Sequence, residues 1–133
     1  MHAPDEGRVV ARLRSLLGPD VLAVYVYGSA ATGTLRPDSD VDLAVLPSHP
    51  IDPMLRFEVA QELAADLHRD VDLVDLRAAP TFLRGQVVGT GRRLFCADEE
   101  EVGLFEAHAL SDYARLHEEM REVLEQFDAR YRS

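Results

Sequence analysis

The sequence predicts an α/β (α+β) fold in which a small mixed β-sheet carries helices on one side and a long helix follows at the carboxyl end. Three strand-like runs, residues 21–27, 41–46 and 70–76, are rich in valine and leucine and have the length of strands. Before the first run, between the second and third runs and after the third, apolar residues recur at the three- to four-residue spacing of helices. A chain of 133 residues, 47% of them hydrophobic, suits one domain with its own core.

Two helices are predicted from their apolar spacing and from the residues at their ends. The first, residues 8–17, stops at a Gly-Pro pair, because neither residue continues a helix. The second follows Asp52, whose carboxylate can accept hydrogen bonds from the first backbone N–H groups, and Pro53 suits the first turn. Its apolar residues recur every four positions: Leu55, Val59, Leu63 and Leu67.

A third, short helix and a last strand follow the strand-like run 70–76. Residues 79–88 predict a helix with Phe82, Leu83 and Val87 turned inward, closed by glycines. Residues 94–97 then read as a brief strand. This completes a core expected to span residues 1–97.

The remaining segment, 98–133, is predicted to be a long helix, because residues 98–131 contain no proline and a single glycine. Its apolar residues fall at intervals of three, four or seven, which places them in one stripe. They are Leu110, Tyr113, Met120, Leu124, Phe127 and Tyr131. The stripe can pack on the core or bind a partner, and the sequence leaves both alternatives open.

The most informative pattern for function is Gly28-Ser29, a spacer of ten residues, and then Asp40-Val41-Asp42. The first strand would deliver Gly28 and Ser29 at its carboxyl end, where a glycine allows a sharp turn and close approach of a phosphate. Ser29 adds a hydroxyl group. Because strand side chains alternate between faces, Asp40 and Asp42 point the same way and can share Mg²⁺ ions. The pattern therefore indicates nucleotidyl transfer.

This motif resembles that of the DNA polymerase β-like nucleotidyltransferases, whose signature is Gly-Ser, a similar spacer and Asp-x-Asp between apolar residues. The short chain is most similar to the minimal nucleotidyltransferases of that superfamily, and among these to the MntA antitoxins, over about residues 8–96. The resemblance implies the polymerase β-like fold and a co-substrate, ATP, held by Gly28, Ser29 and Ser39. It also implies a two-metal site in which Asp40 and Asp42 bind Mg²⁺ ions.

The same superfamily places a third carboxylate on a neighbouring strand, and Asp72 is the predicted residue. Asp72 has an apolar residue on each side, so it lies inside the strand-like run, where a charge needs a metal or hydrogen bonds. Asp75 is the second choice, although it would lie on the opposite face of the strand. For Asp70 and Asp75, capping of the strand ends is the simpler interpretation.

The net charge of −10 bears on which molecule accepts the transferred group. An acidic surface repels a phosphate backbone, and the arginines are scattered without interleaved aromatic residues, so no direct contact with nucleic acid is expected. A protein or a cationic small molecule is favoured. No signal peptide or membrane span is recognisable, so we expect a cytoplasmic protein.

Resemblance to the MntA antitoxins implies transfer of AMP to a tyrosine of a HEPN-type ribonuclease toxin, with which the chain would form a hetero-oligomer. One alternative is an antibiotic nucleotidyltransferase of the aminoglycoside or lincosamide type, although those enzymes usually carry a larger additional domain. The other is a non-catalytic module that neutralises a toxin by binding it. The intact set of carboxylates argues against that second alternative.

Overall fold

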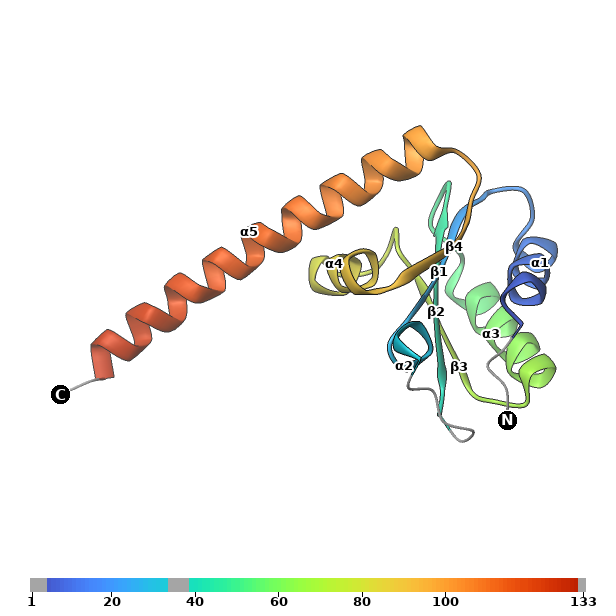
Figure 1. Cartoon of the computed structure of the whole chain (residues 1–133), viewed down its shortest axis with the longest axis horizontal. Helices are drawn as coiled ribbons and strands as arrows, with labels where there is room; N and C mark the ends of the chain where they lie inside the picture. Colours follow the sequence, from blue (N-terminus) through green and yellow to red (C-terminus); the bar gives the residue numbers. More distant parts are fainter. Residues whose placement is uncertain (1–4, 34–38, 132–133) are drawn as a thin grey trace.

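In the computed structural model, which describes residues 5–33 and 39–131, a four-stranded sheet lies between helices (Figure 1). Its strands are ordered β3-β2-β1-β4, with β2 and β3 parallel and the other two pairs antiparallel, so the predicted mixed sheet is confirmed. The elements are α1 (Glu6–Leu17), β1 (Val21–Tyr27), α2 (Ser29–Thr32), β2 (Val41–Pro47), α3 (Pro53–Leu67), β3 (Val71–Asp75), α4 (Thr81–Thr90), β4 (Arg92–Cys96) and α5 (Glu99–Tyr131).

Helices cover both faces of the sheet, so the prediction of helices on one side only is wrong. α1 and α3 pack on one face, and α4 with the first turns of α5 packs on the other (Figure 1). The reason lies in β1, where Val24 and Val26 face the first layer while Ala23 and Tyr25 face the second. A strand that is apolar on both faces needs cover on both.

The predicted helix starts are confirmed by their caps, with a small shift at α1. The Asp5 side chain accepts a hydrogen bond from the Arg8 backbone N–H at 3.3 Å, so α1 begins two residues earlier than its apolar pattern indicated. The Asp52 carboxylate accepts from the Met54 N–H at 2.8 Å, as expected for α3. Polar caps therefore define these boundaries more closely than hydrophobic spacing does.

One inward-facing residue was assigned wrongly. α4 buries Val87 and partly buries Leu83, but Phe82 is 51% exposed. The Phe82 ring instead lies 5.8 Å from the ring of Tyr113 on α5, measured between centroids. Because Phe82 and Leu83 are adjacent, they lie about 100° apart around the helix, and only one of them can face the sheet.

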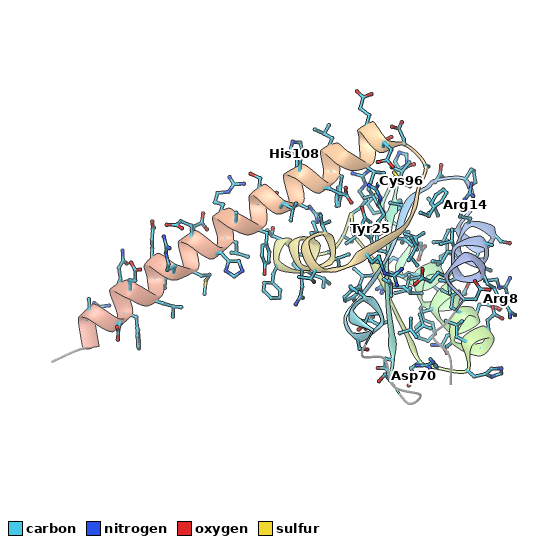
Figure 2. The ribbon with its side chains drawn as sticks, in the orientation of Figure 1. Arg8, Arg14, Tyr25, Asp70, Cys96 and His108 are labelled. Atoms are coloured by element: carbon cyan, nitrogen blue, oxygen red, sulfur yellow. The ribbon has the colours of Figure 1, made fainter. Side chains whose placement is uncertain are left out.

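The helix α5 has a buried root and an exposed arm. Asp98 caps its first turn, accepting from the Glu100 and Glu101 N–H groups at 3.0 and 3.1 Å. Val102 is fully buried, and the Tyr25 hydroxyl donates to the Glu106 carboxylate at 2.8 Å. Beyond the contact with α4 the helix projects away from the sheet (Figures 1 and 2), and residues 117–130 are exposed.

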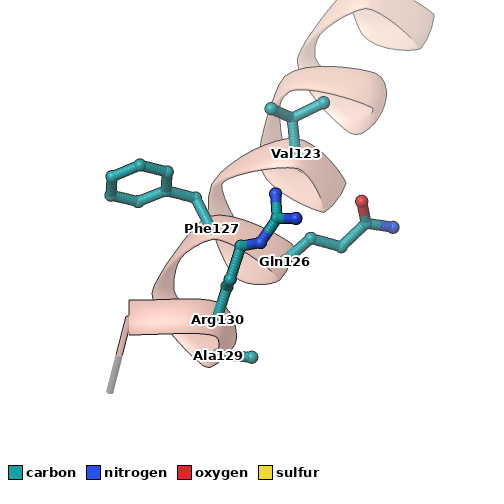
Figure 3. A pocket seen from close by; sticks show the side chains of 5 residues that line it. All are labelled: Val123, Gln126, Phe127, Ala129 and Arg130. Carbon is teal, nitrogen blue, oxygen red and sulfur yellow. The ribbon is translucent and has the colours of Figure 1, made fainter. Parts of the chain in front are cut away.

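The predicted apolar stripe of α5 is therefore divided between two environments. Leu110 and Tyr113 lie beside Gly89 and Gly85 of α4. Farther along, Met120, Leu124 and Phe127 are 51%, 61% and 61% exposed. Near the end of the helix, the described residues that line a surface hollow belong to α5 (Figure 3): Val123, Gln126, Phe127, Ala129 and Arg130.

Close packing of α4 on α5 leads to a stability prediction. A Cβ atom at Gly85 would lie inside van der Waals contact with the Tyr113 side chain, so Gly85→Ala is expected to reduce the free energy of unfolding by about 1–3 kcal/mol. Gly103 on α5 has no neighbour within 4 Å of such an atom. Gly103→Ala should raise stability by about 0.5–1 kcal/mol, because alanine favours helix.

Urea unfolding of both variants at one temperature measures these changes. If Gly85→Ala and the wild type unfold at the same urea concentration, α5 does not pack on α4 as described.

None of the helices in the described residues combines the length and the apolar character that crossing a membrane requires.

Candidate active site

Three side chains form one row across the sheet near the start of β2. In the strand register, Tyr27 of β1 is paired with Asp42 of β2, and Asp42 is paired with Asp72 of β3. Paired residues on neighbouring strands project to the same face. The structure thus brings together two of the predicted carboxylates, from segments thirty residues apart in the sequence.

The turn after β1 places Gly28 directly against this row. Gly28 adopts a φ of 66°, which L side chains rarely reach, and a Cβ atom there would collide with the Asp42 carboxylate. We expected glycine here to admit a phosphate group. In the structure, the first group that a side chain would displace is Asp42 itself.

The electrostatics of the row are those of carboxylates gathered at one place. Burial raises the pKa of Asp42, and the nearby charges of Asp72 and Asp40 raise it further. Desolvation also raises the pKa of the Tyr27 phenol, assisted by Asp72 and Asp42 and by a hydrogen bond with Asp72. Burial and the neighbouring carboxylates disfavour negative charge on Asp42, so a bound cation would stabilise its ionised form.

Tyr27 is the residue of this row that sequence reasoning missed. The apolar pattern marks Tyr27 only as the last residue of a strand. The sequence clue to Tyr27 is its position immediately before Gly28. Its pairing with Asp42 becomes evident only from the register of the antiparallel strands β1 and β2. Tyr27 lies close enough to Asp72 and Asp42 for their negative charges to raise the pKa of its phenol.

The other predicted residues flank the row. Ser29 begins α2 directly after Gly28, and Ser39 precedes Asp40 before β2; both serines are half-buried. Asp40 is exposed and close enough to Asp42 to influence its pKa. The structure therefore places all six predicted residues around one end of β1, β2 and β3.

Asp75, the second choice for the third carboxylate, lies elsewhere. It is 4% exposed and accepts hydrogen bonds from the backbone N–H groups of Ile51 at 2.7 Å and Arg77 at 2.9 Å. Ile51 packs against the core layer of α1 and α3, on the opposite face from Asp42. Asp75 therefore holds loops in place and does not face the row, as the alternation along β3 predicted.

The donor set suits a hard divalent cation, because Mg²⁺ prefers carboxylate oxygens. Within residues 5–33 and 39–131, however, no three His, Cys, Asp or Glu side chains are already gathered around one metal position. Asp40 and Asp72 are exposed, so their side chains have room to turn toward Asp42. By chemistry and charge, the three carboxylates fit such a cation.

A mixed sheet that presents Gly-Ser and Asp-x-Asp at one end defines a class of nucleotide-dependent transferases. The family model for polymerase β nucleotidyltransferases matches residues 14–100, and the chain belongs to this family. The recognised resemblance and the predicted fold are thereby confirmed.

Two relatives share nearly the whole chain. The protein adenylyltransferase MntA of Shewanella oneidensis is 37% identical over 125 residues, which are 94% of this chain and 88% of that protein. A crystal structure of a toxin-antitoxin with AMP-PNP superposes with a TM-score of 0.83 at 36% identity, covering 93% of this chain and 98% of that one.

A further structure contains a tri-AMPylated HEPN toxin of Shewanella oneidensis in complex with its MNT antitoxin. It matches with a TM-score of 0.76 at 34% identity, covering 92% of this chain and 94% of that one. By contrast, the spectinomycin 9-adenylyltransferase of Campylobacter jejuni is 30% identical over only 56 residues, 42% of this chain and 22% of that enzyme.

Proposed function

We propose that this chain is an antitoxin that transfers AMP from ATP to a tyrosine hydroxyl of a cognate HEPN ribonuclease toxin and thereby neutralises it. The observation that carries this proposal is the similarity to the MntA adenylyltransferase along 94% of the chain. The predicted site residues lie inside the matched length. ATP as co-substrate is supported by the related complex with AMP-PNP.

In the proposed reaction, the tyrosine oxygen attacks the α-phosphorus of ATP. A new P–O bond forms, the bond to the bridging oxygen breaks, and pyrophosphate leaves. Gly28, Ser29 and Ser39 would bind the triphosphate, and Asp72 would accept the proton of the hydroxyl group. Asp40, Asp42 and Asp72 would hold Mg²⁺, which when bound neutralises the negative charge of the triphosphate and of the leaving group.

The row near the start of β2 supports this assignment through its position. Asp42 lies between its neighbours Asp40 and Asp72, so one cation position close to Asp42 can be reached by all three. Positioning and charge neutralisation account for most of the rate in phosphoryl transfer, and no covalent intermediate with the protein is required.

The direct test uses ATP labelled at the α-phosphorus, Mg²⁺ and the small helical protein encoded by an adjacent reading frame. Label should appear on the tyrosine-containing peptide of that protein, whose mass increases by one or more AMP groups. ATP labelled at the γ-phosphorus should leave the protein unlabelled, because pyrophosphate departs. Labelling of spectinomycin or another cationic antibiotic instead of the protein would overturn the proposal.

Substitutions of Asp72 and Asp75 should affect different properties: the first should affect catalysis and the second stability. Asp72→Ala is expected to abolish transfer with little change in stability, because this side chain is exposed. Asp75→Ala should reduce the free energy of unfolding by about 2–4 kcal/mol, since two backbone N–H groups lose a charged acceptor. Its activity should persist below its melting temperature.

Labelling rates and thermal unfolding of the two variants are measured side by side. If Asp75→Ala removes activity while folded and Asp72→Ala retains it, the assignment of the third carboxylate is incorrect.

The alternatives from the sequence carry less support. Similarity to the antibiotic-modifying enzyme covers about a fifth of its length, and a spectinomycin adenyltransferase structure at 17% identity shares the fold alone. A non-catalytic binding module would not need carboxylates gathered beside the Gly28 turn. Since ATP is the proposed co-substrate, we place the reaction in the cytoplasm.

The exposed arm of α5 is the proposed contact with the toxin. Its root is part of the enzyme's own core, but Met120 and Leu124 expose much of their apolar surface to solvent. Single exposed apolar residues are common, whereas several on one face of a projecting helix favour a protein interface. The division into residues 1–97 and 98–133 stays a prediction.

A further inference from the structure

A second hollow lies on the same face of the sheet as the candidate active site but at the other end of β3. Asp72 lies near the start of β3, whereas Arg77 follows its last residue, Asp75. The hollow has a volume of about 420 Å³. It is lined by residues of the turn after β3, of α4 and of α5 (His108 is labelled in Figure 2): Arg77, Arg84, Phe105, His108, Ala109 and Asp112.

The two arginines are held in place by the fold rather than extended into solvent. Arg77 donates from Nε to the Pro47 carbonyl oxygen at 2.8 Å, and Arg84 donates from its terminal nitrogen to the Arg77 carbonyl oxygen at 2.7 Å. Both guanidinium groups lie near the face of the Phe105 ring, 5.4 and 6.0 Å from its centroid. These contacts preorganise two positive charges at one place.

These charges lack a carboxylate partner in the part of the chain that the structure describes. Neither Arg77 nor Arg84 forms a salt bridge there, although the chain has 24 acidic and 14 basic residues. Asp112, which lines the hollow, forms its salt bridge with Arg115. The Arg84 Nε atom is buried without a hydrogen-bond acceptor, and a buried donor of this kind is costly to leave unsatisfied.

We propose that this hollow binds the phosphate group of a small molecule, independently of the proposed adenylyltransferase reaction. Guanidinium groups match phosphate oxygens with several N–H donors, and both arginines line the hollow without a carboxylate partner among the described residues. His108 adds a donor from α5. A phosphate accepts from several donors at once, which suits groups converging from different elements better than a two-oxygen carboxylate does.

NMR of the full chain tests the proposal directly through the arginine Nε–H signals. Inorganic phosphate should shift the Arg84 Nε signal in a saturable way at millimolar concentration, and sodium chloride of equal ionic strength should not. ADP without a divalent cation is titrated separately. Tighter binding of ADP would identify a nucleotide as the source of the phosphate, and equal binding would identify free phosphate.

Variants then locate the effect. Arg77→Gln should weaken phosphate binding at least tenfold, and Arg84→Lys, which retains the charge but lacks the paired donors, should also weaken it. Arg8→Gln is the matched control, because this arginine is exposed on α1 in the other helix layer (Figure 2), and it should bind phosphate as the wild type does.

Three outcomes would overturn the proposal. They are a wild-type signal that does not saturate, an Arg77→Gln affinity equal to that of the wild type, and a shift by acetate as strong as that by phosphate. The wild-type titration decides the question even where a variant folds poorly.

Discussion

Asp42→Asn is expected to slow AMP transfer to the toxin by about 10³-fold or more while the protein stays folded. Asp42 is paired with Asp72 and lies next to Asp40, so its loss would remove the central carboxylate of the proposed Mg²⁺ site. Stability should be unchanged or slightly higher. The folded state raises the pKa of Asp42, which means that it disfavours the charged form, and asparagine carries no charge.

Rates of labelling from α-labelled ATP measure the effect, and thermal unfolding checks the fold. Asp20→Asn is the charge-matched control, because Asp20 is exposed and precedes β1 at the opposite end of the sheet. It should transfer AMP at the wild-type rate. Equal labelling by Asp42→Asn and the wild type would remove the two-metal interpretation of this site.

The second large effect is expected on the arm of α5. Replacing both Leu124 and Phe127 with serine should weaken binding of the toxin by an order of magnitude or more, because interfaces depend on a few apolar anchors. Both side chains are 61% exposed in the isolated protein. The free energy of unfolding should therefore fall by only about 0.5 kcal/mol, the difference in helix propensity.

Binding is measured by calorimetry with an inactive toxin variant, and stability by urea unfolding. Glu122→Ser, on the opposite side of the helix, is the control and should bind as tightly as the wild type. Leu63→Ser, in the enzyme's core, should cost several kcal/mol. A comparable loss of stability for the Leu124 and Phe127 pair would assign the stripe to the core and exclude the interface.

Deleting the whole helix would be a poor substitute for these point changes. Its root buries Val102 and supplies the Glu106 carboxylate to which the Tyr25 hydroxyl donates. Loss of these contacts would destabilise the sheet whether or not the arm binds a partner.

The features of the candidate site that follow from the alternation of side chains along a strand could be predicted from the sequence. Alternation along a strand separates Asp72 from Asp75, and the structure agrees. Asp40 lies just before the first residue of β2, so its shared face with Asp42 stays a prediction. The catalytic and binding roles of these residues stay predictions. The pairing of Tyr27 with Asp42 depends on strand order, which local sequence does not specify.

Elements that depend on tertiary packing were harder to predict. Helices cover both faces of the sheet because both faces of β1 are apolar. The unbroken apolar run of residues 21–27 is the sequence pattern that indicates this. Adjacent Phe82 and Leu83 compete for one face of α4, and spacing alone does not choose between them. The arginine hollow joins Arg77, Arg84 and Phe105 from separate elements, so no motif marks it.

The strand order also determines how this protein avoids aggregation. β3 and β4 are the outer strands of the sheet, and an outer strand can pair with another chain through its outward-facing backbone groups. Asp70 and Asp72 place charge on one edge, and Arg92 and Arg93 on the other. Charge on an outer strand opposes pairing with another chain, so we expect polar replacements at Asp72 to retain more of that protection than apolar ones.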